Sequence, residues 1–552
     1  MRTVPDLLRR SARLVPDRPA IVLDGGGTLT FAELEARSNA FARGLRERGV
    51  GHGDRVALAI GGAAWPRYAI AYFATLKLGA VALLTGARFG EDELARIADG
   101  YGVARIVRPG DDLGAGQAAE PLVAAVAPGD AAEVVFTSGT TDRPRGVVAT
   151  HANLLRAQAA WPSAPRANQP CAHALPVGSV AAQAVLLTCV GGQHTLLAAA
   201  AFAVPGFTAM VARERAVTVC LVPAMGHWLV RAAPGEATPM PSVRGVSFSG
   251  APLPVPIMAD LAAVFPNAAF HNFYTSTETY PARVATRFDP RRPEAVGRPV
   301  GTSAVRVTGP GGETLPPGET GEVWLRAGGA PPREVLDPEH RIDVAGGWTR
   351  TGDLGHLDAD GTLFLTGRAS DVVIVGGFNV STGRVEQILT RHPAVAEAAV
   401  CGTEHPVLGE IVAAFVVLRP GSPDAAGTTA TDLRRFAAEH LTRPEVPAVV
   451  RLVDDLPRNE AGKVVKRQLP VEFREPGTAL ERDLAAVWAE VLRIDAVGAT
   501  DNFFEIGGDS LAATRIAATA RERLGVDVDT IAVLEAPSVA ELAQYILERN
   551  EP

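Results

Sequence analysis

Hydrophobic positions along the chain recur either at helical spacing or in short continuous runs. Residues 28–49 place apolar side chains at helical spacing, with a threonine cap before them and a glycine stop behind them. Short apolar runs, separated by helical stretches, are expected to form strands at 55–60, 80–84, 105–109, 217–223 and 243–253. Because strands and helices alternate, the sequence predicts a layered α/β domain.

This pattern changes after residue 300. Near residue 301 it gives way to short strands with Gly and Pro turns, which indicate a β-rich subdomain. A compact α+β segment follows, and the polar residues 471–478 form an expected linker. The last stretch is helical by period and predicts a four-helix bundle. The expected fold class is multidomain, α/β plus α+β plus all-α, with domains at 1–368, 369–470 and 479–552.

Composition and charge narrow the classes of function. The chain has 552 residues, too many for one hydrophobic core, and a formal net charge of -8 argues against non-specific nucleic-acid binding. Four scattered cysteines give neither a zinc motif nor a disulfide framework, which favours a reducing cytoplasm. The charged N-terminus lacks the apolar core of a signal peptide, and the apolar stretch 181–204 is interrupted by Gly, Gln and His. We therefore expect a cytoplasmic protein that binds neither nucleic acid nor membrane.

A hydroxyl-rich loop, "VVFTSGTTDRPRGV", occupies residues 134–147 behind an expected strand. Its glycines let the backbone approach a ligand closely, its hydroxyls can donate to phosphate oxygens, and Arg145 adds a permanent charge. The residues concerned are Thr137, Ser138, Gly139, Thr140, Thr141 and Arg145. The Gly-Lys-Ser/Thr ending of the Walker loop is missing. Taken alone, the stretch fits an ordinary polar turn better than a phosphate loop.

Three further motifs change that interpretation: "NFYTSTET" at 272–279, "TRTGDLGHLDADGTLFLTGRASD" at 349–371 and "EAGKVVKR" at 460–467. Together with the loop, in this order and at these distances, they resemble the adenylate-forming superfamily of acyl- and aryl-CoA ligases, peptide-synthetase adenylation domains and luciferases. The resemblance covers residues 1–470. It implies a large adenylation core, a small mobile C-terminal subdomain, and ATP and Mg²⁺ as cofactors.

The resemblance also assigns roles in the ATP site. The loop 137–145 resembles the phosphate loop that closes over the pyrophosphate end of ATP. Tyr274 resembles the aromatic residue that stacks on adenine, and Thr277 the hydroxyl that contacts the α-phosphate. Glu278 resembles the carboxylate that holds Mg²⁺, a hard cation suited to oxygen ligands. Asp353 resembles the residue that accepts hydrogen bonds from both ribose hydroxyls, a task for an acceptor-only side chain.

A second group of residues matches the mobile subdomain of that superfamily. Arg368 resembles an arginine that also reaches the ribose, and Asp371 falls on the hinge between the large and small subdomains. Lys463 resembles the lysine that bridges the substrate carboxylate and the α-phosphate. An ammonium group there stabilises the charge that two anions share in the transition state. Lys466 and Arg467 are expected to form a solvated or structural positive patch.

The C-terminal bundle carries its own signature, "DNFFEIGGDSLAATRI". It resembles the peptidyl or aryl carrier-protein motif, with Ser510 as the attachment point for 4'-phosphopantetheine. The two glycines expose Ser510 at the start of a helix near Leu511, where a phosphodiester lies at the positive helix end. An Asp-Ser pair alone would also serve as a plain helix cap. The resemblance covers residues 478–548 and implies a phosphopantetheinyl transferase as a partner.

The chain departs from the superfamily pattern at two places. In the phosphate loop, Asp142 stands where the family usually has Gly, and Arg145 stands where it has Lys. In the adenine motif, Thr275 and Ser276 replace the common Gly and Pro. We expect ATP binding to survive these changes, with adenylation slower than in a standard member.

The acid-binding pocket is expected to be neutral. Its presumed residues are Ser179, Val180, Ser247, Ser249, Phe273 and Pro281. No aspartate stands at the position that pairs with the α-ammonium group in amino-acid-activating relatives, and an unpaired ammonium in an apolar pocket is costly. The expected substrate is a small carboxylic acid without an α-amino group, aryl or short acyl. An amino or imino acid anchored in another way stays open.

The expected function follows from both signatures in one chain. The enzyme would activate the acid as an acyl-adenylate and transfer it to its own carrier domain, in nonribosomal peptide or related secondary-metabolite biosynthesis. No condensation motif or GxSxG elbow is present, so the thioester would pass to a downstream partner enzyme. Two alternatives stay open: a ligase that uses free coenzyme A or a separate carrier, and a catalytically silent docking or carrier-presenting module.

Overall fold

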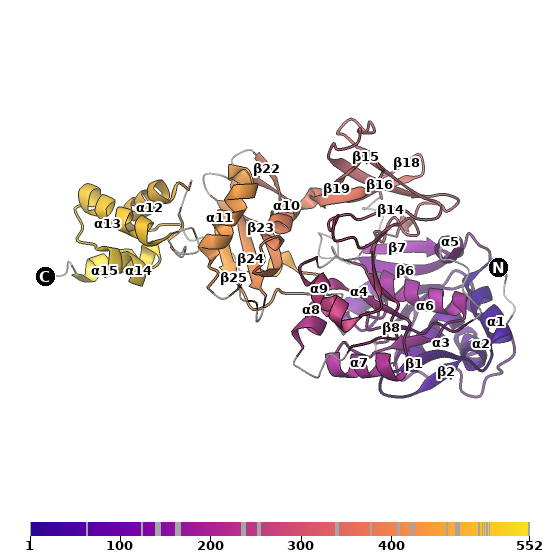
Figure 1. Ribbon diagram of the computed structural model, residues 1–552. Coiled ribbons are helices and arrows are strands. Elements are labelled where there is room, and N and C mark those ends of the chain that lie inside the picture. The colour runs from indigo at the N-terminus through magenta and orange to yellow at the C-terminus, as the bar shows by residue number, and fades with distance from the viewer. Residues whose placement is uncertain are drawn as a thin grey trace. The chain divides into compact units, whose positions relative to one another are not determined.

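A computed structural model gives the fold of the chain (Figure 1). It describes residues 2–61, 64–122, 125–137, 145–159, 167–232, 239–250, 255–336, 342–375, 378–405, 409–419, 422, 424–425, 427–459, 462–469, 475–494, 497–499, 501, 503, 506 and 508–549. The chain divides into two compact units, residues 1–365 with 460–463, and residues 366–459 with 464–552.

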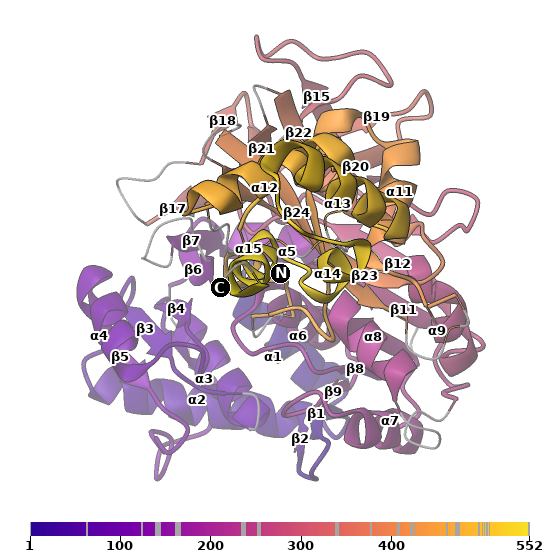
Figure 2. The same ribbon diagram turned by 90° about the vertical axis from the view of Figure 1, so that its left-hand side faces the viewer.

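A nine-stranded sheet forms one layer of the first unit. Its strands, in spatial order, are β14 (Arg298–Pro299), β13 (Val284–Arg287), β12 (Ala269–Tyr274), β11 (Gly245–Phe248), β10 (Thr218–Leu221), β8 (Cys171–His173), β9 (Leu196–Ala198), β1 (Pro19–Leu23) and β2 (Thr28–Thr30). Its middle, from β12 to β1, is parallel, and both edges are antiparallel. Figure 2 lets the order be followed from β12 through β11, β8, β9 and β1 to β2.

A second, six-stranded sheet carries the hydroxyl-rich loop. Its strands are β17 (Glu334–Val335), β7 (Arg145–Thr150), β6 (Ala131–Thr137), β4 (Val81–Leu84), β3 (Arg55–Leu58) and β5 (Val103–Val107). The strands β5, β3, β4 and β6 are parallel, whereas β7 runs antiparallel to β6. The loop therefore connects two neighbouring antiparallel strands.

Helices alternate with these strands, as the apolar spacing predicts. They are α1 (Val4–Leu14), α2 (Phe31–Glu47), α3 (Trp65–Lys77), α4 (Glu91–Gly100), α5 (His151–Ala159), α6 (Val180–Gly192), α7 (Val204–Arg213), α8 (Pro223–Arg231) and α9 (Met258–Val264). Large aromatic side chains of α3, Trp65, Tyr68 and Tyr72, are fully buried in the main core. The layered α/β prediction is confirmed.

The first predicted helix begins later than the apolar spacing suggests. Residues 28–30 form β2, because they pair with β1, and α2 begins at Phe31. The Thr30 hydroxyl accepts a hydrogen bond from the backbone N–H of Glu33 (3.2 Å), and the Glu33 carboxylate accepts one from the Thr30 N–H (2.9 Å). This reciprocal cap satisfies two donors that the first helical turn would otherwise leave free.

The β-rich part expected after residue 301 is a five-stranded sheet. It consists of β15 (Ser303–Thr308), β16 (Gly321–Ala327), β18 (Val344–Ala345), β19 (Trp348–Leu357) and β20 (Leu363–Arg368), and the pairings between β15, β16, β19 and β18 are antiparallel. Cation–π contacts cover part of it: the Arg306 guanidinium lies 4.8 Å from the Trp348 ring centroid and the Arg326 guanidinium 4.6 Å from it. These contacts let long basic side chains cover apolar ring surface.

The second unit contains a small α+β layer. Its sheet has β22 (Phe378–Ser381), β21 (Val372–Val375), β24 (Gly409–Leu418) and β23 (Val395–His405), and β25 (Val449–Leu452) pairs with β24. The helices α10 (Thr382–Thr390) and α11 (Ala430–His440) contribute to its core, which includes Leu389 and Leu433. This matches the α+β character expected for the segment.

The C-terminal part of that unit is a helical bundle, drawn in yellow in Figure 1. It comprises α12 (Ala479–Leu492), α13 (Ser510–Leu524), α14 (Thr530–Glu535) and α15 (Val539–Arg549). Trp488 and Phe503 are fully buried in its core, with ring centroids 5.2 Å apart in an edge-to-face arrangement. The predicted four-helix bundle is confirmed. None of the helices that the structure describes combines the length and apolar character that crossing a bilayer demands.

Gly508 is required by packing in this bundle. A methyl group on its Cα would overlap the Phe503 ring. We expect Gly508→Ala to destabilise the bundle by about 1–3 kcal/mol, because a close-packed core resists an added methyl group. Hydrogen exchange of amides in α12–α15 would measure this loss. Gly477→Ala is the matched control, since a Cβ there meets Glu481 Oε2 at an ordinary 3.5 Å; equal protection in both variants would contradict the prediction.

Candidate functional site

Strands β6 and β7 hold the two ends of the predicted phosphate loop together. Thr137 is the last residue of β6 and pairs with Arg145, the first residue of β7. The loop residues between them, including Ser138, Gly139, Thr140 and Thr141, lie outside the described residues. The described part thus confirms the strand expected before the loop, while the phosphate contacts of the loop stay predictions.

Two residues with predicted ATP roles lie side by side. The Tyr274 hydroxyl, at the end of β12, donates a hydrogen bond to Asp353 Oδ2 in β19 at 2.5 Å. Asp353 is only 7% exposed, and its own N–H donates to the Thr351 hydroxyl at 3.1 Å. The fold therefore unites an aromatic ring and a carboxylate from motifs 79 residues apart. The pair offers a ring face and a charged acceptor within one small region, which suits a nucleoside.

The turn after Tyr274 presents the other two residues of its motif. The Thr275 hydroxyl donates to the Ala282 carbonyl at 2.7 Å and closes the turn. Thr277 and Glu278 are half-buried between these ends. Among the described residues, the Glu278 carboxylate has neither a hydrogen bond nor an ion pair. A single free carboxylate fits Mg²⁺ that arrives with ATP, because this ion usually takes one or two carboxylates together with phosphate oxygens and waters.

Arg333 was not anticipated from the sequence, yet it lies beside this turn. It is 3% exposed, its guanidinium lies 5.1 Å from the Tyr280 ring centroid, and its nitrogens have no hydrogen-bond partner within the described part of the chain. Burial lowers the pKa of Arg333, and the carboxylates of Glu133 and Glu278 oppose that shift. Glu133 belongs to β6, and its Oε2 accepts from the Tyr72 hydroxyl at 2.8 Å. A buried positive charge thus interacts electrostatically with Glu133 of the phosphate-loop strand and with Glu278, the predicted Mg²⁺ ligand.

The predicted pocket residues Ser247, Ser249 and Phe273 share one face of the nine-stranded sheet. Ser247 pairs in register with His271 in the parallel neighbour, and alternate residues of a strand lie on the same side. The Ser247 hydroxyl lies 3.1 Å from Cys220 Sγ on β10. In the sequence, Cys220 is one of four scattered cysteines that form neither a zinc motif nor a disulfide framework. The register between β10 and β11 places Cys220 on this face of the sheet.

The other predicted pocket residues are Ser179, Val180 and Pro281. The Ser179 hydroxyl accepts a hydrogen bond from the backbone N–H of Ala182 at 3.2 Å and caps α6. Val180 is half-buried and packs against the main core, while Pro281 is buried. Their place in an acid pocket stays a prediction, and the side chains involved are neutral.

Residues of the predicted mobile subdomain are distributed over both units. Lys463 is exposed and belongs to the same unit as Tyr274 and Asp353. Arg368, the last residue of β20, is exposed, and Asp371 ends a short 3₁₀ turn, η3 (Ala369–Asp371). Both belong to the second unit. Their ribose and hinge roles stay predictions.

Ser510 is exposed as the first residue of α13. The helix therefore begins one residue before Leu511, because Asp509 is the N-cap and its carboxylate accepts from the Ala512 N–H at 2.7 Å. The capping duty thus falls on Asp509 and leaves the Ser510 hydroxyl available for attachment. A phosphodiester there would lie at the positive end of a 15-residue helix.

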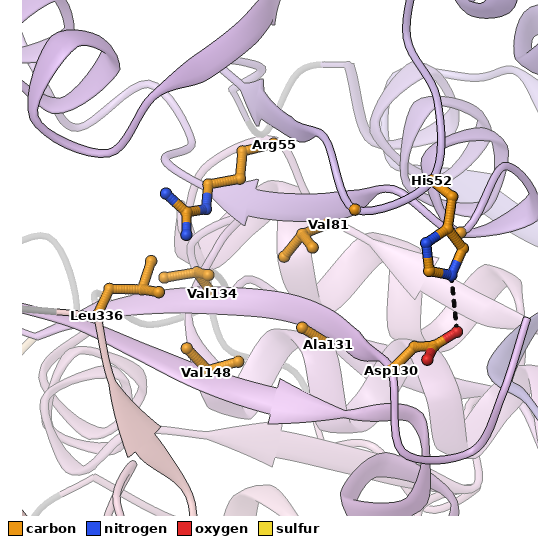
Figure 3. A pocket seen from close by; sticks show the side chains of 10 residues that line it. His52, Arg55, Val81, Asp130, Ala131, Val134, Val148 and Leu336 are labelled. Atoms are coloured by element: carbon orange, nitrogen blue, oxygen red, sulfur yellow. Dashed lines mark hydrogen bonds and ion pairs between the residues drawn. The ribbon is translucent and has the colours of Figure 1, made fainter.

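A cavity of about 190 Å³ lies in the first unit, and β6 and β7, the strands that flank the predicted phosphate loop, both contribute to its lining. Figure 3 shows Arg55 at one end of it and, at the other, His52 Nε2 paired with Asp130 Oδ2 at 2.9 Å. The rest of its lining is apolar or glycine: Gly53, Gly79, Val81, Ala131, Val134, Val148 and Leu336. None of the predicted catalytic, ATP-binding or pocket residues lines this cavity.

Family models match most of the chain. The model of the AMP-binding enzyme matches residues 8–119 and 108–330, and that of the AMP-binding enzyme C-terminal domain matches residues 384–463. The model of the phosphopantetheine attachment site matches residues 482–546. These matches confirm the combination that the sequence motifs predicted.

Individual relatives align with all or most of the chain. Novobiocin biosynthesis protein H of Streptomyces niveus is 28% identical over 98% of this chain and 95% of its own length. Phosphinothricin tripeptide synthetase PhsC of Streptomyces viridochromogenes is 30% identical over 100% of this chain, which spans 53% of that synthetase. Among solved structures, o-succinylbenzoate CoA synthetase of Bacillus subtilis, in complex with the acyl-adenylate OSB-AMP, superposes with a TM-score of 0.71 at 26% identity. It covers 85% of this chain and 98% of its own.

Proposed function

Because the chain belongs to the AMP-binding enzyme family and carries a phosphopantetheine attachment domain, we propose that it activates a small acid without an α-amino group and loads it onto its own Ser510. The chain is an adenylate-forming ligase joined to a carrier domain, and its relatives include enzymes of secondary-metabolite biosynthesis. The observation that carries the proposal is this union of both parts in one polypeptide, with Ser510 exposed at a helix start.

The first half-reaction joins the acid to the nucleotide. A carboxylate oxygen forms a bond to the α-phosphorus of ATP, and the bond from that phosphorus to the pyrophosphate oxygen breaks. Tyr274 and Asp353 would hold the nucleoside, Asp353 as acceptor for the ribose hydroxyls. Thr277 would contact the α-phosphate, and Glu278 would hold Mg²⁺, which supplies charge neutralisation on the phosphates. Lys463 would lie between the carboxylate and the α-phosphate.

The second half-reaction moves the acyl group to the carrier domain. Once a phosphopantetheinyl transferase has modified Ser510, the attached arm supplies the thiol that accepts the acyl group. A carbon–sulfur bond forms, and the carbon–oxygen bond to AMP breaks. Asp371 would act as the hinge that removes Lys463 from the acid between the two half-reactions. The resulting thioester would pass to a downstream synthase or tailoring enzyme.

The described pocket residues support an acid without an ammonium group. Ser247, Ser249 and Phe273 are neutral, and the Ser179 hydroxyl is occupied by the cap of α6. A buried ammonium needs a charged or strongly accepting partner, because its desolvation is otherwise uncompensated. A flat aryl acid or a short acyl acid needs no such partner.

A substrate panel tests this proposal. Carboxylate-dependent exchange of pyrophosphate into ATP would be measured for the full chain with benzoate, butyrate and proline. We expect exchange with benzoate or butyrate to exceed exchange with proline. Intact mass after phosphopantetheinylation would then show an acyl increase on Ser510. Exclusive exchange with proline would overturn the proposed substrate class. Acylation of free coenzyme A without a mass increase on Ser510 would favour a CoA ligase. No exchange with any carboxylic acid would favour a catalytically silent module.

The Tyr274–Asp353 hydrogen bond gives a prediction about ATP affinity. Tyr274→Phe keeps the ring and removes the donor that orients the Asp353 carboxylate. We expect the KM for ATP to rise about tenfold with kcat little changed, since a hydrogen bond to a charged group contributes about 1.5–3 kcal/mol. ATP titration of pyrophosphate exchange measures this effect. Tyr545→Phe, which removes a hydroxyl bonded to Arg549 in the bundle, is the control; equal KM values in both variants would contradict the assignment.

A further inference from the structure

The loop that carries Lys463 is closed at its base by backbone contacts. Arg458 and Val464 form an isolated antiparallel bridge, and the N–H of Val465 donates to the carbonyl of Pro457 at 2.8 Å. Lys463 immediately precedes this bridge. Its location is therefore governed by the two arms of chain that enter and leave the loop.

The arm that enters the loop is held by an ion pair. The Arg458 guanidinium pairs with the Glu397 carboxylate of β23, and the two side chains are only 11% and 22% exposed. Because the pair is largely buried and charge-assisted, it fixes Arg458 against the small sheet.

The arm that leaves the loop is held by Lys466, three residues after Lys463. The Lys466 ammonium lies 2.7 Å from Glu386 Oε1, 3.0 Å from the Thr382 hydroxyl and 3.7 Å from Asp371 Oδ2. The first two oxygens are within hydrogen-bond distance of the ammonium, and the Asp371 carboxylate adds a longer ion pair. Lys466 therefore ties the loop to α10 and to the residue predicted as the hinge.

Glu386 is itself fixed in place. Its Oε1 also accepts a hydrogen bond from the backbone N–H of Val400 in β23 at 2.8 Å. Burial raises the pKa of Glu386, and the neighbouring ammonium of Lys466 opposes that shift. Removing the ammonium would leave a largely buried carboxylate without its counter-charge.

From this geometry we infer that Lys466 is a positioning residue that sets the location of Lys463 through its contacts with Glu386, Thr382 and Asp371. The inference rests on the proposed function, in which Lys463 stabilises the transition state of adenylation. Lys463 has no part in thioester formation in that scheme. Loss of Lys466 should therefore slow the first half-reaction selectively.

The variant Lys466→Met keeps the aliphatic stem and removes the charge. We expect kcat for pyrophosphate exchange to fall about 10- to 100-fold, because small misplacements of a catalytic group are costly. The assay uses whichever of benzoate, butyrate or proline gives the highest wild-type exchange. Transfer from the corresponding chemically prepared acyl-adenylate to phosphopantetheinylated Ser510 should stay near the wild-type rate. The adjacent Arg467→Met is the matched control, since Arg467 is exposed and should affect neither half-reaction.

A double variant separates this inference from the proposed function. In a Lys463→Ala background, Lys466→Met should produce no further loss, because the group it positions is gone. Equal loss in both half-reactions, full additivity with Lys463→Ala, or an equal effect of Arg467→Met would overturn the positioning role. If Lys463→Ala alone left exchange unchanged, the proposed function of Lys463 would fail instead.

Hydrogen exchange of the Val465 amide tests the positioning role of Lys466 without a substrate. The Val465 amide is hydrogen-bonded at the base of the loop. We expect faster hydrogen exchange of this amide in Lys466→Met and in Glu386→Gln, with the wild-type rate in Arg467→Met. Unchanged protection of Val465 in the first two variants would show that the loop does not depend on Lys466.

Discussion

Replacing Ser510 by alanine is expected to abolish acyl loading of the chain and to leave carboxylate-dependent pyrophosphate exchange near the wild-type rate. The hydroxyl of Ser510 is the attachment point in the proposed scheme, so its removal eliminates the thiol that accepts the acyl group. The first half-reaction uses only residues of the adenylation part, and it has no need of that thiol. Intact mass spectrometry after treatment with a phosphopantetheinyl transferase and ATP measures the loss.

Thr514→Ala is the control for this experiment. Thr514 is exposed on the same helix, one turn from Ser510, and its hydroxyl donates to the Ser510 carbonyl at 2.9 Å. It should load normally, because the helix keeps its Asp509 cap. Acyl loading of Ser510→Ala at another residue would contradict the carrier assignment. A parallel loss of pyrophosphate exchange would mean that the carrier domain takes part in adenylation.

Local features of the structure, such as helix caps and helix starts, were predictable, because the residues that cause them lie close together in the sequence. The cap of α2 by Thr30 and Glu33 lies within four residues, and the exposed start of α13 follows from the "GGDS" stretch. Apolar spacing was likewise sufficient for the layered core and for the bundle. The boundary of α2 was missed by three residues because pairing with β1, a tertiary contact, claims Thr28–Thr30.

Contacts between distant residues were not predictable in this way. The resemblance supplied separate roles for Tyr274 and Asp353, but not the hydrogen bond between them. Arg333 is buried and interacts with residues from three distant segments, around Tyr72, Glu133 and Tyr280, and nothing in its local sequence separates it from a solvated arginine. The sequence predicts a solvated or structural positive patch of Lys466 and Arg467. Only the fold shows that Lys466 has a structural role, because it pairs with Glu386, eighty positions earlier in the chain.

Lys463→Ala is expected to lower kcat for pyrophosphate exchange about 100- to 1,000-fold, the usual cost of removing one group that stabilises developing charge. The carboxylate and the α-phosphate are both anionic, and their approach concentrates negative charge as the new bond forms. An ammonium placed between them offsets that repulsion only while the bond is forming. The effect should therefore appear in kcat, with the KM for ATP changed much less, because Tyr274 and Asp353 retain the nucleoside.

Transfer of the acyl group from a prepared acyl-adenylate to phosphopantetheinylated Ser510 should survive Lys463→Ala, since that step no longer brings two anions together. Arg467→Ala, which removes an exposed positive charge four residues away, controls for a general loss of charge near the loop. If Lys463→Ala slowed both half-reactions equally, the lysine would support the fold of the small subdomain. If exchange were unchanged, the charge between the two anions would have to come from another residue. The buried guanidinium of Arg333, which interacts electrostatically with Glu278, would be the first to test.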